Sequence, residues 1–448
     1  MNSPQNSRNI AFKILNEILF DYKIKDNVLC DLSTEIEKLP KQDISFLYEL
    51  VHGVLRWKLR LDFMISHCIE LTKIQAKLLN ILRIGFYQLY FMNVKNHAAI
   101  NETVNLLSNK KQKGFVNAIL RKSQRLCFDY KNLGDERTSV LFSMPRWIVD
   151  KLNSDFSHLQ AIKILSYLLK RPSHSMRIDT DYEVEIEKAL KNEGIEFSKS
   201  ALSKSAYFIN SQKHPLIKKF IDDGKIYIQD IGSQIVVDCL DPKNDDVIWD
   251  VFAGVGGKSF HIRQKACKAT ILASDKDKRR SSVLKEFGNN DSAFLGVKAD
   301  VFKFDPMVEL RAFNKKFEGK EKRVFSKILI DAPCSGIGTI SKNPDLKWRI
   351  KKDDISALAQ IQLNSLLMAS KYLKPGGQIT YSLCTFNFEE TDAVINQFLK
   401  LRREFNINDN YPKAMNEFKT NKGYLRLFPY QTKQSGYFIA NLYLSSGF

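Results

Sequence analysis

The stretch that decides the fold is Val247-Ile-Trp-Asp-Val-Phe-Ala-Gly-Val-Gly-Gly-Lys-Ser259, in which an apolar run passes into a glycine-rich loop. The apolar run predicts a buried strand, and the residues after the loop predict a helix. Glycines let the backbone pass close under a ligand, and a helix N-terminus offers free amide groups to the ligand's polar atoms. The loop therefore predicts a nucleotide-like cofactor bound by Phe252, Ala253, Gly254, Val255, Gly256, Gly257 and Lys258.

The end of this loop, Gly256-Gly-Lys-Ser259, also resembles the end of a phosphate-binding P-loop. The first glycine of the P-loop pattern would fall on Phe252, so the loop lacks the glycine needed to wrap phosphates. We therefore do not expect a P-loop.

Acidic residues follow two further predicted strands, residues 270–274 and 294–298. Asp275 lies at the end of the first, where a carboxylate accepts both ribose hydroxyls of an adenosine. Asp300 follows the second and can meet the adenine amino group. Either aspartate alone is more often a loop residue or a helix cap, but with the glycine loop they predict a cofactor across three strand ends. A dinucleotide and S-adenosylmethionine both fit such a site.

The pattern around these residues predicts three regions. From residue 221 to 448 strands alternate with helices, with further strands at 327–330 and 378–382, which is typical of a doubly wound, Rossmann-like α/β domain. Residues 436–443 alternate as an antiparallel edge strand does. Residues 1–129 carry apolar stripes at helical spacing and predict an all-helical domain, and residues 130–220 predict a small α+β connector.

The composition favours a polyanionic partner. The chain of 448 residues has a formal net charge of +19 and a pI near 9.4, and such charge suits nucleic acid. A Lys-rich composition throughout the chain is the bland alternative. A basic cluster is either a solvated face or an RNA contact: Lys110, Lys111 and Lys113 lie in the turn before a predicted helix at residues 115–125, which ends with Arg121, Lys122 and Arg125.

Seven cysteines are scattered along the chain without a Cys-x-x-Cys pair, so we expect neither disulfides nor a metal site. The N-terminus lacks the apolar core of a signal peptide, and no stretch is long and apolar enough for a membrane span. We therefore expect a soluble cytoplasmic protein.

Two of the cysteines directly follow predicted buried strands, in Asp331-Ala-Pro-Cys334 and Tyr381-Ser-Leu-Cys384. A thiolate can add to C6 of a pyrimidine and make C5 a carbon nucleophile, whereas hydride transfer has no need of two cysteines. This pair favours S-adenosylmethionine and cytosine methylation. Asp331 is the natural carboxyl group to bind N3 of the ring.

The attacking cysteine is harder to assign. Asn387-x-x-Glu390 predicts a helix start close behind Cys384, which would favour its thiolate. Cys334 has fewer such cues. A buried, unreactive thiol is the alternative for each of them, and it suits the other five cysteines well.

Several motifs resemble the Sun-type, or RsmB-like, RNA cytosine-C5 methyltransferases. The N-terminal region, with His97-Ala-Ala-Ile-Asn-Glu and Lys113-Gly-Phe-Val-Asn-Ala-Ile-Leu-Arg, is similar to the NusB-like RNA-binding domain of the bacterial 16S rRNA enzymes. The motifs that carry the first resemblance are residues 252–258, Asp331-Ala-Pro-Cys-Ser-Gly-Ile-Gly-Thr, Asn343-Pro-Asp-Leu-Lys-Trp, Lys374-Pro-Gly-Gly and Tyr381-Ser-Leu-Cys.

The resemblance implies a NusB-like all-α domain, a connector and a class I methyltransferase domain. It implies that S-adenosylmethionine lies against residues 252–258, Asp275, Asp300 and Asp331. It also implies that Cys384 bonds to C6 and that Cys334 assists release of the methylated base. The chain departs from the family pattern at Gly254-Val255, where Ala-Pro is usual, and at Leu383, where Thr is usual.

These observations together predict methylation at C5 of a flipped-out cytosine in 16S rRNA, either free or in an early small-subunit particle, by a monomeric enzyme. The alternatives are methylation of tRNA or of a protein, and an RNA-binding or antitermination factor with a vestigial catalytic domain. A further set of residues is expected either to hold the RNA backbone or to start a solvated helix: Lys347, Trp348, Arg349, Lys351 and Lys352.

Overall fold

The computed structural model describes residues 7–21, 23–131, 133–210, 214–319 and 323–446. The chain forms two compact units. We call Met1–Lys170 with Ile340–Lys352 the helical unit, and Arg171–Thr339 with Asp353–Phe448 the α/β unit. Residues 130–170 thus group with the N-terminal helices, and residues 340–352 return to them. The division into three domains at residues 129/130 and 220/221 stays a prediction.

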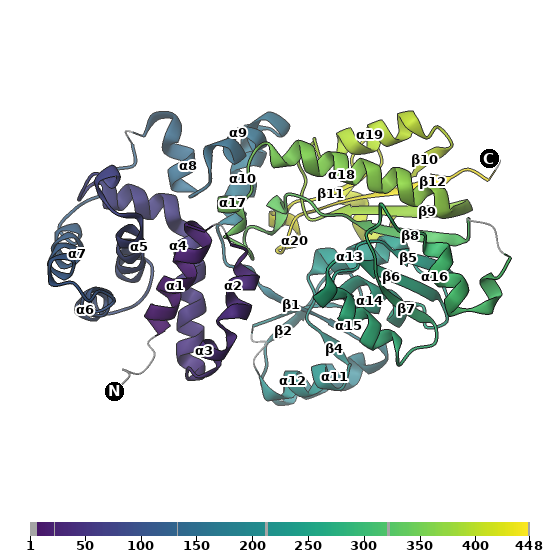
Figure 1. The fold of residues 1–448 in the computed structure, drawn as a ribbon, viewed down its shortest axis with the longest axis horizontal. Coiled ribbons are helices and arrows are strands. Elements are labelled where there is room, and N and C mark those ends of the chain that lie inside the picture. The colour runs from purple at the N-terminus through teal and green to yellow at the C-terminus, as the bar shows by residue number, and fades with distance from the viewer. Residues whose placement is uncertain (1–6, 22, 132, 211–213, 320–322, 447–448) are drawn as a thin grey trace. The chain divides into compact units, whose positions relative to one another are not determined.

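The helical unit contains the helices that the apolar stripes predict (Figure 1). Ile14, Leu50 and Phe86, one from each stripe, are fully buried in one hydrophobic core, because residues spaced three or four apart share a helix face. The helices are α1 (Ser7–Leu19), α2 (Lys25–Asp31), α3 (Ser33–Glu37), α4 (Lys41–Ser66), α5 (Ala76–Tyr90), α6 (Asn96–Val104), α7 (Lys110–Ser123), α8 (Arg137–Leu141), α9 (Arg146–Asp155), α10 (His158–Leu168) and α17 (Leu346–Arg349).

The segment Ile340–Lys352, which contains α17, is anchored inside the helical unit. Lys347 is buried, and its Nζ donates to the backbone oxygens of Arg56 (2.8 Å) and Ser143 (2.5 Å). Trp348 Nε1 donates to a backbone oxygen of α4 at 2.7 Å. The expectation that these side chains hold an RNA backbone is therefore wrong for Lys347 and Trp348, whose polar atoms are already used within the protein.

The α/β unit begins with a small antiparallel sheet in the order β2-β3-β1-β4. One of its faces packs on two helices through Met176, Tyr207 and Ile209. The sequence pattern predicts a strand at 175–178, a helix at 183–193 and a strand at 206–209, and the structure confirms all three. It misses the other two strands, of three and two residues, which are too short to show a periodicity. The elements are β1 (His174–Ile178), α11 (Glu183–Asn192), β2 (Phe197–Lys199), β3 (Ala206–Ile209), α12 (Pro215–Asp222) and β4 (Ile226–Tyr227).

The main sheet has the order β10-β12-β9-β8-β5-β6-β7, with β11 paired to β12. The strands from β7 to β9 pair in parallel, which confirms the doubly wound pattern. The carboxyl ends of β5 and its neighbours meet where the strand order reverses, the place where such sheets bind ligands. The strands are β5 (Val247–Asp250), β6 (Thr270–Asp275), β7 (Phe294–Lys298), β8 (Phe325–Asp331), β9 (Leu373–Leu383), β10 (Phe405–Asn408), β11 (Leu425–Leu427) and β12 (Tyr437–Leu444).

The last strand, β12, is antiparallel as predicted, but the prediction of an edge strand is wrong. It pairs with β9 on one side and with β10 and β11 on the other. Nearly all its residues are buried, so the apparent alternation in the sequence did not mark a solvent-facing side.

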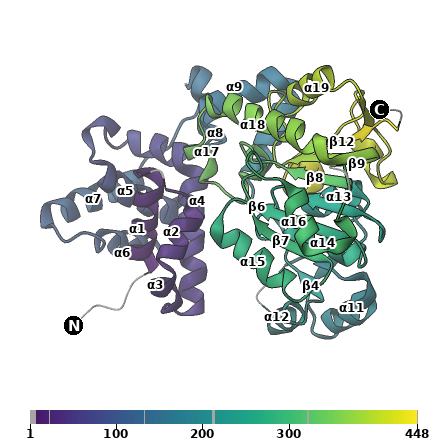
Figure 2. The ribbon, with the colours of Figure 1, turned by 45° about the vertical axis from the view of Figure 1, so that its right-hand side comes forward.

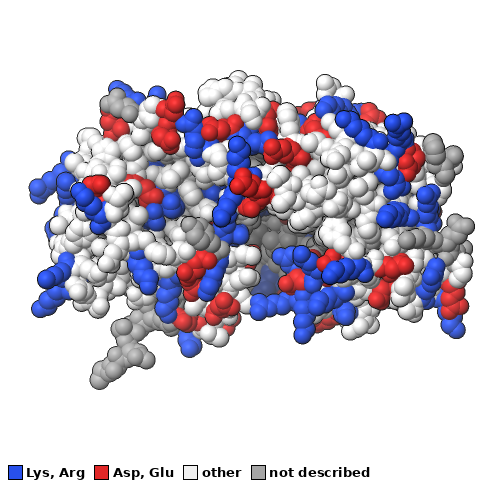
Figure 3. All heavy atoms as spheres, turned by 45° about the horizontal axis from the view of Figure 1, so that its top comes forward, with Lys and Arg blue, Asp and Glu red and all other residues white. Residues whose placement is uncertain are grey.

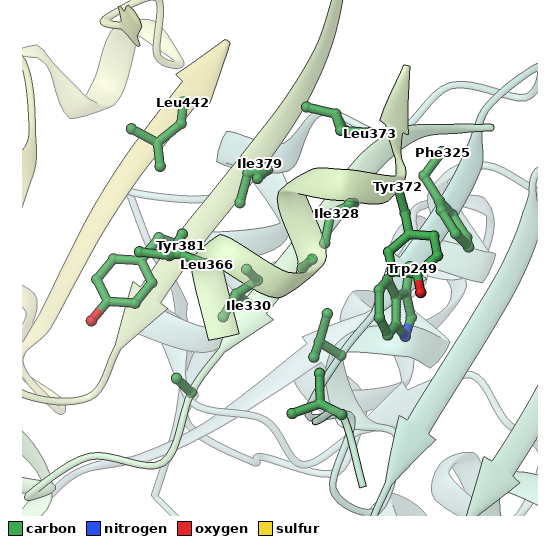
Figure 4. Close-up of a cluster of buried hydrophobic side chains, with 14 of the residues drawn as sticks. Trp249, Phe325, Ile328, Ile330, Leu366, Tyr372, Leu373, Ile379, Tyr381 and Leu442 are labelled. Carbon is green, nitrogen blue, oxygen red and sulfur yellow. The ribbon is translucent and has the colours of Figure 1, made fainter. Parts of the chain in front are cut away.

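Helices cover both faces of the main sheet (Figures 1 and 2). Figure 4 shows the core under one face, where Trp249 lies edge-on to Tyr372, with ring centroids 5.7 Å apart, and close to Phe325. On this face lie α16 (Pro306–Phe313), α18 (Asp354–Ala369) and α19 (Asp392–Leu401); on the other lie α13 (Ile231–Leu240), α14 (Gly257–Lys265) and α15 (Lys278–Gly288). A short helix, α20 (Pro429–Thr432), precedes β12. None of the described helices is long and apolar enough to cross a membrane.

Candidate active site

A pocket of about 690 Å³ lies at the carboxyl ends of β5, β6 and β8. Six of the seven residues predicted from the glycine loop line it, as do Asp275, Asp300 and Asp331. Gly256 does not line the pocket. It caps the N-terminus of α14 with φ of +92°, and a side chain there would meet the ring of Phe260. Gly254 also has a positive φ, of +60°, at a place where the family pattern has alanine.

Asp250, the last residue of β5, is buried beneath the glycine loop and lines the pocket. Ser259 Oγ donates to its Oδ2 at 2.6 Å, whereas no described residue donates to Oδ1. Burial raises the pKa of Asp250 to about 7, although Ser259 and Lys258 act against the shift. A buried carboxylate oxygen without a partner fits a ligand with a hydrogen-bond donor, such as the ammonium group of S-adenosylmethionine.

Asp275, the last residue of β6, and Asp300, which follows β7, are held in different ways. Asp275 is buried, and its carboxylate accepts from the backbone N of Gly254 (3.0 Å) and of Asp277 (2.8 Å). Asp300 follows the end of β7 by two residues, is exposed, and accepts from the backbone N of Phe302 at 3.1 Å. The first is fixed against the glycine loop, and the second stands at the rim of the pocket.

Asp331, at the end of β8, is held from two sides. Lys258 Nζ donates to its Oδ2 at 2.5 Å, and Ser382 Oγ donates to its Oδ1 at 2.6 Å. Burial lowers the pKa of Lys258, but the charge of Asp331 and the hydrogen bond to it outweigh burial, so this pKa lies above its ordinary value. Cys384 contributes to the same shift, so Lys258 lies near the second cysteine as well as the aspartate.

The two cysteines singled out in the sequence lie side by side. Their sulfur atoms are 3.4 Å apart, although fifty residues separate them in the chain. The pairing of β8 with β9 causes this, because it sets Asp331 opposite Ser382 and brings the loops after both strands together. The hydrogen bond with Cys384, burial and the charge of Glu390 raise the pKa of the Cys334 thiol well above its ordinary value.

Gly338 lets three backbone segments meet behind the cysteines. Its N donates to Cys384 O at 3.0 Å, and its O accepts from Gly436 N at 2.9 Å. A Cβ at this position would lie 2.3 Å from Gly436 O and 2.8 Å from Cys384 O, so a side chain cannot be accommodated without backbone movement.

The box Asn387-x-x-Glu390 forms, but not at a helix start. Asn387 Oδ1 accepts from Glu390 N at 3.0 Å, while the Glu390 side chain turns toward Ser335 N at 2.8 Å. The next helix, α19, begins at Asp392, after the box and not at it, so the predicted helix start close behind Cys384 is wrong. The glutamate is therefore used to hold the Cys334 loop instead of capping a helix.

Tyr437 is a site residue that the sequence reasoning missed. It is buried, and its hydroxyl lies 2.9 Å from Ser233 Oγ, which lines the pocket. Burial raises its pKa well above the ordinary value, and the charges of Asp230, Cys384 and Asp331 add to the shift. No local signal marks it, because an aromatic residue at the start of a strand is ordinary core.

Among the described residues, no group of three or more His, Cys, Asp or Glu side chains is placed to hold a metal ion. The chemical groups that the pocket and its surroundings bring together are a glycine loop, aspartates at the strand ends, a lysine and two thiols.

Comparison with protein families assigns both regions of the chain. Residues 237–443 match the model of the 16S rRNA methyltransferases RsmB/F, and residues 5–125 match that of the NusB family.

Named relatives match over nearly their whole length. The chain is 30% identical to the probable ribosomal RNA small subunit methyltransferase B of Bacillus subtilis, covering 97% of this chain and 98% of the relative. It is 29% identical to ribosomal RNA small subunit methyltransferase B of Photorhabdus laumondii, covering 89% and 91%.

Solved structures show the same fold. PH0851 matches with a TM-score of 0.79 at 22% identity, over 99% of both chains. NSun6 from Pyrococcus horikoshii, solved with SFG, matches with a TM-score of 0.56 at 20% identity, over 68% of this chain and 99% of that one. With these matches beside the geometry of the site, the chain belongs to the RsmB/F family of S-adenosylmethionine-dependent 16S rRNA methyltransferases.

Proposed function

We propose that this enzyme methylates C5 of a cytosine in 16S rRNA, and that Cys384 forms a transient bond to C6 of that base. The observation that carries the proposal is the position of the two sulfur atoms, 3.4 Å apart, at the ends of strands whose last residues include Asp331 and Ser382. A single reactive cysteine would suit many reactions. Two adjacent thiols beside a carboxylate suit one thiol that attacks a ring and another that assists its release.

The chemistry of the proposed reaction balances. S-adenosylmethionine supplies the methyl group and leaves as S-adenosylhomocysteine. The Cys384 thiolate adds to C6, and the electron pair of the C5–C6 double bond moves toward C5, which takes the methyl group. A base then removes the C5 proton, the C6–sulfur bond breaks, and the double bond returns. N3 takes up a proton as the thiolate adds and gives it up when the double bond returns, and the Asp331 carboxylate accepts a hydrogen bond from this N3–H while the ring carries the added charge.

The surroundings of the two thiols support this assignment of roles. The raised pKa of Cys334 keeps it a thiol near neutral pH, and a thiol is a poor nucleophile. Lys258, whose pKa Cys384 helps to raise, places a cation near the sulfur that we assign as the nucleophile. Lys258 also keeps Asp331 in place, so one side chain orients two parts of the reaction.

The helical unit supplies the natural RNA contact. Helix α7 contains no acidic residue, and Lys110, Lys111, Arg121 and Lys122 are exposed on it. Lys and Arg side chains are spread over the face drawn in Figure 3, with acidic side chains between them. Part of the charge of +19 is therefore general, and the acid-free α7 is the better candidate. We further propose that a monomer acts on free 16S rRNA or an early small-subunit particle.

The test is methyl transfer to an unmodified 16S rRNA transcript, followed by bisulfite mapping of 5-methylcytosine. Cys384→Ala should abolish transfer, and Cys334→Ala should trap a protein–RNA adduct that resists denaturation. Cys267→Ala, an exposed cysteine outside the pocket, is the matched control. Trapping by Cys384→Ala and loss of transfer in Cys334→Ala would reverse the two roles, and methylation of a tRNA transcript alone would overturn the substrate.

A further inference from the structure

We propose that Glu390 and Gln362 are positioning residues that clamp the backbone on both sides of Cys334 and thereby set how fast the methylated base is released. The inference rests on the proposed role of Cys334 in release. It concerns two residues that do not themselves line the cofactor pocket and that touch no reacting atom.

The contacts define the clamp. Gln362 Nε2 donates to Pro333 O at 2.9 Å, and Ser335 N donates to Glu390 Oε1 at 2.8 Å. The same Gln362 nitrogen donates to Glu390 Oε1 at 3.0 Å. The residues immediately before and after Cys334 are thus tied to one hydrogen-bonded pair of side chains.

Burial makes this pair unusual. Glu390 and Gln362 are both completely buried, and burial raises the pKa of Glu390 despite three groups that donate to its carboxylate. A buried carboxylate is costly compared with an apolar side chain of similar size. Its contacts give it a role that an apolar residue cannot fill, because it accepts from Ser335, Gln362 and Asn387 at once.

The clamp also joins the loop of Cys334 to that of Cys384. Ser335 Oγ donates to Thr385 Oγ1 at 3.0 Å, and Asn387 Nδ2 donates to the same Thr385 oxygen at 3.1 Å. Tyr381 OH donates to Glu390 O at 2.8 Å. Strand pairing brings the two loops together, and side chains from α18 and from the loop before α19 hold them there, with the sulfur atoms 3.4 Å apart.

Release should depend on the clamp more than attack does. Cys384 follows β9 directly, and the pairing of β9 with β8 and β12 fixes the end of that strand. Cys334 lies in a segment with neither helix nor strand, so side chains hold it in place. A misplacement of about 1 Å can cost on the order of 10²-fold in rate, so loosening the clamp should slow the step that uses Cys334.

Two variants separate position from charge. Gln362→Met keeps the shape of the side chain and removes the tether to Pro333 without changing any charge. Glu390→Gln keeps an acceptor for Ser335 N but loosens the clamp, because an amide nitrogen replaces the oxygen that accepts from Asn387, and it also removes the negative charge that raises the pKa of Cys334. Both should trap adduct. In the pH profile of the release rate, Glu390→Gln should in addition move the change caused by ionisation of Cys334 toward lower pH. A purely structural defect does not produce this shift.

The experiment measures the fraction of enzyme in denaturation-resistant adduct with a 16S rRNA transcript and S-adenosylmethionine, beside single-turnover methyl transfer. We expect the trapped fraction in Gln362→Met and Glu390→Gln to rise about tenfold, while methyl transfer changes less than about threefold. Thr380→Val is the matched control, because it removes a buried hydrogen bond to Asn441 (2.8 Å) on the same sheet without touching the clamp.

Cys334→Ala, measured in parallel, separates the two proposals. If Cys334→Ala traps adduct and neither clamp variant does, the clamp is refuted and the proposed function stands. If Cys334→Ala itself traps no adduct, the proposed role of Cys334 in release is contradicted, and the clamp proposal, which rests on it, is contradicted as well. Melting temperatures of all variants show whether either clamp variant has lost its fold, and Thr380→Val gives the effect of destabilisation alone.

Discussion

Lys258 Nζ lies 2.5 Å from Asp331 Oδ2, so the first helix after the glycine loop is tied to the end of β8, the strand that precedes Cys334. The two residues are 73 positions apart in the chain. This ion pair joins the cofactor pocket to the reacting thiols, because Lys258 also lies near Cys384.

Removal of the ion pair should damage the reaction more than the fold. In Lys258→Met the Asp331 carboxylate keeps Ser382 as a donor but loses its cation, and the Cys384 thiolate loses a neighbouring positive charge. We expect single-turnover methyl transfer to fall by about 10²-fold or more. Lys265 lies on the same helix as Lys258 and forms an ion pair with Asp238. Lys265→Met breaks that ion pair, is the control, and should keep most activity. Equal losses in both variants would mean that the helix, and not this lysine, is what matters.

Asp250 should make both stability and cofactor affinity depend on pH. Its folded pKa of about 7 lies above the ordinary 3.8, so the unliganded wild type loses stability as pH rises through this interval and the buried carboxyl ionises. Each pKa unit corresponds to about 1.4 kcal/mol. The melting temperature of Asp250→Asn relative to the wild type should therefore increase between about pH 5 and pH 8.

Cofactor affinity should depend on the ionisation of Asp250 in the opposite direction from stability. An ammonium group binds the ionised carboxylate, so wild-type affinity for S-adenosylmethionine should weaken as pH falls through about 7, and Asp250→Asn should bind weakly at all pH values. Isothermal titration calorimetry at several pH values checks both statements. A variant that binds as tightly as the wild type would contradict the assignment of Asp250 Oδ1 to the cofactor.

Gly338→Ala should separate the two thiols. The added Cβ would lie 2.3 Å from Gly436 O, so the loop after Cys334 has to move away from Cys384. We expect lower stability by about 1 to 3 kcal/mol and slower formation of a Cys334–Cys384 disulfide under mild oxidation with peroxide. Gly114→Ala on α7, where an added Cβ meets nothing within 4 Å, is the control and should stabilise the protein slightly.

Some lysines of the helical unit should contribute to RNA binding, whereas the buried Lys347 should not. Replacing Lys110, Lys111 and Lys113 with Gln should weaken RNA binding and reduce its salt dependence. For a double-stranded site, the slope of log K against log salt should change by about 0.9 for each phosphate that a removed lysine had neutralised. Lys347→Met should leave RNA affinity and its slope unchanged, because the Lys347 amine is buried against backbone oxygens. Filter binding at several salt concentrations distinguishes the two sets.

The short-range features of this chain could be predicted from sequence because they depend on local spacing. The strand at 294–298 and the two stripes that contain Leu50 and Phe86 follow from periodicity, and the glycine loop follows from composition. The place of β12 inside the sheet could not be predicted, since a short alternating run looks the same at an edge and in the interior.

The candidate site divides in the same way. The sequence by itself picked out the residues to which we assign chemistry, because motifs depend on residue type and local order; they are the loop at 252–258, Asp275, Asp331, Cys334 and Cys384.

The tertiary structure alone decided how these residues meet. It placed the two sulfur atoms 3.4 Å apart, turned Glu390 from a helix cap into a support for the Cys334 loop, and buried Lys347 away from any RNA. The physical reason is that the pairing of β8 with β9 and the burial of polar side chains depend on partners far away in the chain, which no local pattern specifies.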